Sequence, residues 1–141
     1  MFLRLTFTAS LSLLTATIPQ IANAKCLDVS KHEPGTLEGK LLFIVFPGRP
    51  NYEDVKSGDE PEGTYILKLA NQICIEGDEF ADATKLFDTV HLVPPKGLRK
   101  DLRPLVGRTV KVTLYDQYGS HTGHHHAPLV AWVSKIALAK Q

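Results

Sequence analysis

Histidine is concentrated in one short segment of the chain. Four of the six histidines lie between residues 121 and 126, as His121, His124, His125 and His126. If this run is extended, alternation puts His124 and His126 on one face and His125 on the other. A turn at residues 122–123 could then fold His121 back beside them. Neutral imidazole is a good ligand for Zn²⁺, Cu²⁺ and Ni²⁺, so His121, His124 and His126 are candidate ligands for one of these ions. The alternative is a polar turn whose histidines hydrogen-bond loop backbone.

A second polar segment runs from residue 49 to residue 63 and contains five carboxylates, two prolines and two glycines. Arg49 could clamp a carboxylate or a phosphate, and Tyr52 could stack on a sugar or a base. Together with Asp59 and His125, these side chains form the predicted ligand-binding set. In the alternative interpretation, Arg49 pairs with an acidic neighbour and Tyr52 caps the core.

The local patterns of the common catalytic sites are missing from the sequence. No serine or cysteine stands in a nucleophile elbow, and there is no glycine-rich phosphate loop. The carboxylates of residues 53–62 do not have the spacing of a helix-loop-helix calcium site. We therefore predict no catalytic residues and favour a protein that is not an enzyme. A metal-assisted hydrolase that combines the histidines with Glu53 or Asp59 is a third hypothesis.

The first residues have the pattern of an export signal. Arg4 precedes an uncharged run over residues 5–18, and Ala22 and Ala24 supply the small side chains that signal peptidase needs. The run is shorter than the roughly 20 apolar residues of a spanning helix. We predict a signal peptide over residues 1–24, a mature domain over residues 25–141, and a periplasmic or secreted location without stable membrane insertion.

Export changes the expected chemistry of Cys26 and Cys74, which are the only two cysteines. In an oxidising compartment they most simply form one disulfide. A lipoprotein is disfavoured, because Lys25 stands where that processing needs a small residue before Cys26.

Length and charge limit the remaining possibilities. The chain has 141 residues, 43% of them hydrophobic and 22% charged, which is enough for one globular domain. Without residues 1–24 the basic and acidic side chains balance. A neutral domain lacks the strong positive field that usually drives binding to nucleic acid or to an anionic membrane, so we predict no nucleic-acid partner.

The elements that must position these side chains are mostly short strands. Strand patterns cover residues 37–46, 64–69, 73–75, 87–93, 107–115 and 129–138, and residues 96–104 have room for one helical turn. A sheet built from so few residues must close on itself, because an open sheet of this size would leave its edges and one face uncovered. We predict a five-to-six-stranded antiparallel barrel of the oligonucleotide/oligosaccharide-binding (OB) type. An immunoglobulin-like sandwich is disfavoured because Cys26 lies at the very start of the mature chain.

Five segments together resemble a known family. They cover residues 46–53, 58–62, 65–69, 105–113 and 121–126, and the run His121-Thr-Gly-His-His-His is the most specific of them. The chain resembles, over most of residues 37–137, the exported bacterial proteins grouped as domain of unknown function 4431. The resemblance implies a small periplasmic module and no particular activity.

The sequence thus favours an exported, non-enzymatic binding or envelope-protecting module. Its recognition surface would join the two polar loops, and its partner would be an envelope ligand or another protein. A periplasmic Zn²⁺, Cu²⁺ or Ni²⁺ protein that uses the histidine cluster is the alternative.

Overall fold

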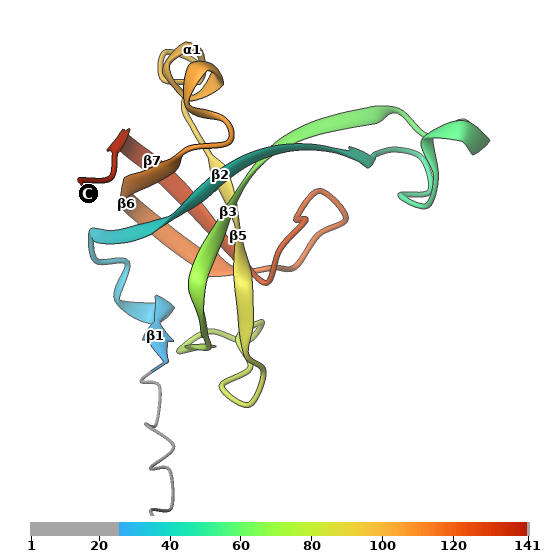
Figure 1. Cartoon of the computed structure of the whole chain (residues 1–141). Helices are drawn as coiled ribbons and strands as arrows, with labels where there is room; N and C mark the ends of the chain where they lie inside the picture. Colours follow the sequence, from blue (N-terminus) through green and yellow to red (C-terminus); the bar gives the residue numbers. More distant parts are fainter. Residues whose placement is uncertain (1–25, 141) are drawn as a thin grey trace, which may run out of the picture.

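Residues 26–140 are described by a computed structural model (Figure 1). Five strands close a barrel in the order β2-β3-β5-β7-β6; these are β2 (Gly35–Pro47), β3 (Pro61–Ile73), β5 (Phe87–Val93), β6 (Thr109–Gly119) and β7 (Leu129–Leu138). Neighbouring strands are antiparallel except β5 and β7, which are parallel. The predicted barrel is confirmed, and its one parallel pair is the departure from the fully antiparallel sheet expected.

Alternating side chains explain why these segments form a barrel. In β6, Val110, Val112 and Leu114 are buried, while Lys111 among them and Tyr115 after them are exposed. The buried side chains join residues of the other four strands in one core. Burial of alternate apolar side chains is what holds a strand to one register.

One end of the barrel is closed by the short helices α1 (Arg99–Leu102) and η3 (Arg103–Leu105), which confirm the helical turn predicted there. Leu102 is completely buried and belongs to the core. Two backbone hydrogen bonds attach the end of this segment to β2: Gly107 N–H donates to Leu41 O at 2.7 Å, and Leu41 N–H donates to Arg108 O at 2.9 Å.

The disulfide between Cys26 and Cys74 is present and links residues 48 positions apart. Beside it, β1 (Leu27–Asp28) and β4 (Ile75–Glu76) form a small parallel sheet. The 3₁₀ helix η1 (Val29–Lys31) directly follows β1 in the chain. The disulfide therefore attaches the start of the described chain to the segment that follows β3.

Two loops that extend to one side of the barrel carry the polar residues of interest (Figure 1). Residues 48–60, which include η2 (Val55–Ser57), connect β2 to β3 at the tip of a long arm, and residues 120–128 connect β6 to β7 beneath it (Figure 1). In OB-type barrels the corresponding loops flank the ligand-binding face. Within residues 26–140, no helix has the length and apolar character needed to cross a membrane. The predicted signal peptide lies outside these residues.

Candidate functional site

The two polar loops are in direct contact. Tyr52 Oη lies 2.9 Å from His124 Nε2, and the two rings meet edge to face. Gly123 lies against the ring of Tyr52: a Cβ added at residue 123 would be 3.1 Å from three ring carbons. The glycine therefore makes room for Tyr52 to reach residues 120–128, which we call the histidine loop.

Glu62, near the start of β3, holds the histidine loop from a second side. Its Oε1 lies 2.8 Å from His124 Nδ1, and its Oε2 lies 3.2 Å from His126 Nε2. An ionised carboxylate only accepts hydrogen bonds, so these two ring nitrogens carry the protons. In neutral His124 the Nε2 atom is then the acceptor, and the Tyr52 hydroxyl donates to it. A hydroxyl, an imidazole and a carboxylate thus form one hydrogen-bonded chain from loop to loop.

Burial and hydrogen bonding act in opposite directions on Glu62. Burial raises its pKa, but the hydrogen bonds from His124 and His126, and the positive charge of either imidazole when it is protonated, outweigh burial and lower the pKa below its ordinary value. The carboxylate that the two histidines need as an acceptor is therefore the favoured form.

Asp59 gives residues 48–60 their shape. Its carboxylate is only 4% exposed and accepts hydrogen bonds from the N–H groups of Asn51 (2.8 Å), Glu53 (2.7 Å) and Asp54 (3.0 Å). The bonds from Asn51 and Glu53 hold the pKa of Asp59 below its ordinary value. Tyr52, between these donors, has a φ of +60°, a left-handed conformation that is uncommon for a tyrosine. The carboxylate thus stabilises the strained turn that presents Tyr52.

The remaining histidines form a second group beside the first. His121 N–H donates to His125 Nδ1 at 3.1 Å, and their rings are 4.6 Å apart. His126 N–H donates to His91 Nδ1 at 3.2 Å, and the ring of His126 stacks on Phe46 at 4.2 Å. Burial, followed by the charges of His126 and His125, lowers the pKa of His91 to about 4. These contacts attach the β6–β7 loop to the outer surface of β2 and β5.

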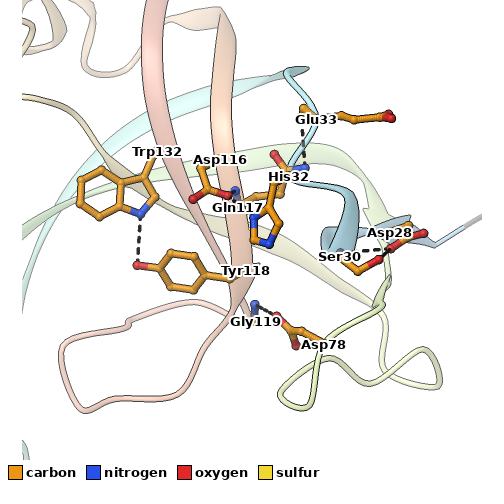
Figure 2. Close-up of polar contacts among 10 residues, drawn as sticks. All are labelled: Asp28, Ser30, His32, Glu33, Asp78, Asp116, Gln117, Tyr118, Gly119 and Trp132. Atoms are coloured by element: carbon orange, nitrogen blue, oxygen red, sulfur yellow. Dashed lines mark hydrogen bonds and ion pairs between the residues drawn. The ribbon is translucent and has the colours of Figure 1, made fainter.

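A third set of contacts fixes the strand ends beneath the loops (Figure 2). Trp132 Nε1–H donates to Tyr118 Oη at 3.2 Å, and Gly119 N–H donates to a carboxylate oxygen of Asp78 at 2.8 Å. Tyr118 in turn lies against the rings of His121 and His125. The end of β6, from which the histidine loop starts, is therefore held by Trp132 on one side and by Asp78 on the other.

The structure groups the predicted site residues differently from the sequence expectation. Tyr52 and His124 meet, but Asp59 lies inside its loop, with its oxygens occupied by backbone donors. Arg49 is exposed and forms no ion pair within the described chain, so the pairing with an acidic neighbour is not found there.

The predicted metal ligands are divided between the two histidine groups. His124 and His126 share Glu62, whereas His121 lies beside His125 and has its Nδ1 2.9 Å from Gly119 O. Over residues 26–140, no three histidine, cysteine or carboxylate side chains are placed to hold a metal ion. The turn at residues 122–123 thus directs His121 away from the pair it was expected to join.

Sequence reasoning missed Glu62 and His91 as members of the site. Glu62 was one of five carboxylates in its segment, and only the pairing of β2 with β3 puts it opposite Phe46. Alternation with Val90 and Leu92, which are buried, is the signal that could have placed His91 on the outer face of its strand. The loop that covers it comes from 35 residues further along the chain.

Comparison with known proteins gives one match. Residues 89–137 match the model of a family described as Domain of unknown function (DUF4431), which confirms the resemblance for that part of the chain. The matched range begins within β5 and includes the histidine loop and all of β7 except Leu138. The searches of curated proteins and of solved structures found no significant match.

Proposed function

We propose that this protein is an exported, non-enzymatic binding module of the cell envelope, and that residues 48–60 and 120–128 form its recognition surface. The observation that carries the proposal is the hydrogen-bonded chain from Tyr52 through His124 to Glu62, which joins two polar loops from distant parts of the sequence. Placement of these loops at the binding end of an OB-type barrel supports the proposal by analogy.

Order in both loops is what makes the surface suitable for binding. The backbone of residues 48–60 is bonded to Asp59, and the histidine loop is bonded to Glu62 and His91. A preformed surface loses little conformational entropy when it takes up a ligand. Arg49, exposed at the edge, supplies a guanidinium for a carboxylate or a phosphate of the ligand.

Capture from envelope extracts tests the proposal. Immobilised protein is incubated with solubilised envelope proteins and with cell-wall fragments, and bound material is identified by mass spectrometry. We expect one class of ligand to be retained by the wild type and lost from an Arg49→Ala, His125→Ala variant. Lys31→Ala, an exposed change outside both loops, is the control and should retain it. If no material is retained and the protein instead turns over a substrate, the proposal is wrong.

The alternative, a Zn²⁺, Cu²⁺ or Ni²⁺ protein, has weaker support because His121 lies apart from His124 and His126. Calorimetric titration of tag-free protein with each ion decides it, with a His124→Ala, His126→Ala variant as the control. Binding no tighter than about 10 μM, roughly −7 kcal/mol, would exclude a physiological metal site.

A further inference from the structure

Charge is unevenly distributed over the barrel, although its sum is close to zero. Nine basic residues lie at the end that carries α1 and the end of β7, together with only two acidic residues, Glu38 and Asp101. We call this the basic end; its basic residues are Lys40, Lys96, Arg99, Lys100, Arg103, Arg108, Lys111, Lys135 and Lys140. The rest of the described chain has thirteen acidic and five basic residues.

Strand pairing brings the members of the basic end together. Lys40 is opposite Thr109, next to Arg108, and Lys111 lies between Glu38 of β2 and Ala137 of β7. Arg108 and Lys140 line one surface depression, and Lys111, Lys135 and Lys140 line the next. The other four basic residues lie within residues 96–103. The backbone hydrogen bonds between residues 107–108 and Leu41 attach this segment to the same end of the barrel. Figure 1 shows the end of β7 on the side of the barrel away from the histidine loop, and α1 above the barrel.

These cations are free to meet an external anion. All nine side chains are exposed, and none of them forms an ion pair with another described residue. Lys31 and Lys85, elsewhere on the molecule, each pair with an aspartate, and so does Lys68, which lies opposite Lys40 on β3.

Exposed apolar side chains accompany the cations. Val106 is 39% exposed and Leu138 is 50% exposed, and Leu138 lines the same depression as Arg108 and Lys140. Phe43, 49% exposed, lines another depression together with Arg99 and with Glu62 and His91 of the candidate site. Cations that surround isolated apolar side chains suit an interface with both anionic headgroups and acyl chains.

We propose that the basic end docks the protein on the surface of an anionic phospholipid membrane. The cations bind the headgroups, and Val106 and Leu138 enter the boundary between headgroups and acyl chains. Repulsion of the acidic remainder by the same membrane orients the molecule. The loop of residues 120–128, which lies on the side away from the end of β7 (Figure 1), then points away from the membrane, toward ligands in the surrounding compartment. This inference is independent of the function proposed for those loops.

Co-sedimentation with vesicles tests the docking. The probes are vesicles of phosphatidylcholine alone and vesicles with about 30% phosphatidylglycerol. We expect binding to the anionic vesicles that is at least about tenfold tighter and that is lost near 0.5 M salt, because screening weakens contacts between exposed charges. Equal binding to both vesicle types, or none, would overturn the proposal.

Two matched variants locate the surface. Arg103→Glu, Arg108→Glu, Lys140→Glu should weaken binding to anionic vesicles by about tenfold or more. Lys31→Glu, Lys56→Glu, Lys85→Glu makes the same change in net charge outside the basic end and should weaken it much less. Circular dichroism melts establish that both variants are folded. If the two variants lose binding equally, net charge rather than this surface is responsible and the proposal is wrong.

The apolar side chains separate a membrane from a soluble polyanion. Val106→Ser, Leu138→Ser should weaken vesicle binding by about threefold or more, because less apolar area enters the bilayer. The same variant should bind heparin, which offers only charge, as the wild type does. If it binds vesicles as tightly as the wild type does, the surface is a general polyanion site and the membrane assignment is wrong.

Discussion

At the scale of single residues, Glu62 is the side chain on which the candidate site depends most. One carboxylate accepts hydrogen bonds from two imidazoles of the β6–β7 loop, and it is itself the second residue of β3. Its role is therefore to hold a loop to a strand. This differs from the role of Asp59, which holds its own loop together.

Replacing Glu62 by glutamine should loosen the histidine loop. The amide nitrogen of Glu62→Gln would face a ring N–H, so at least one of the two hydrogen bonds is lost. Hydrogen bonds to charged groups stabilise by about 1.5–3 kcal/mol, and partial exposure reduces this, so we expect a loss of about 1 kcal/mol. Urea denaturation measures it. Glu60→Gln, exposed and without a side-chain hydrogen bond in the described chain, is the control; similar losses in both variants would contradict this role.

His91 should make stability depend on pH. Its pKa is lowered to about 4, so between that value and about 6.5 the unfolded chain binds more protons than the folded one. Stability should therefore fall as the pH is lowered from about 6.5 toward 4, and His91→Gln should reduce this fall. Denaturation midpoints at several pH values measure it. An unchanged pH dependence in the variant would show that His91 is not responsible.

At the scale of elements, β2 is the strand that makes the closed barrel possible. It pairs with β3 over one part of its length and with β6 over another, and Gly39 belongs to both ladders. A side chain at this position would meet the backbone carbonyl of Lys68 well inside van der Waals contact. The strand can bend between its two partners because residue 39 has no Cβ.

Gly39→Ala should therefore destabilise the barrel. Overpacking of this kind costs about 1–3 kcal/mol, and the clash with backbone places the expected loss near the upper end. Gly35→Ala, in the same strand, is the matched control, because nothing lies within 4 Å of its added Cβ. Thermal melts of the two variants give the comparison. If Gly35→Ala is as damaging as Gly39→Ala, strand propensity rather than close approach explains the effect.

At the scale of the whole molecule, the disulfide and the charge distribution matter most. Cys26 to Cys74 closes a loop of 48 positions and joins the small β1–β4 sheet to the barrel. The end of β7, which belongs to the basic end, and the loop of residues 120–128 lie on opposite sides of the barrel in Figure 1, so one small domain can present two different surfaces.

Removing the disulfide should lower the stability of the whole domain. For a loop of this length, restriction of the unfolded chain corresponds to about 4 kcal/mol. Cys26→Ser, Cys74→Ser should show this loss in urea denaturation, and reduction of the wild type should reproduce it. The reduced wild type thus serves as the control for the serine side chains. A change below about 1 kcal/mol in both would contradict the expected contribution.

The sequence by itself determined the architecture, because the information was local. Alternation in residues such as Val110 to Leu114 selects strands, turn residues end them, and the only two cysteines leave one possible pair. The OB-type barrel, the disulfide and the helical turn were all predicted in this way.

Only the tertiary structure decided which polar groups meet. His121 beside His125, Glu62 beneath His124 and His126, and nine cations at one end all depend on register and on how loops pack over strands. The net charge near zero also gave no indication of the basic end, because a net charge does not show where the charged residues lie in the structure. Contacts between residues far apart in the chain depend on the closed barrel as a whole, and no local pattern of side chains contains them.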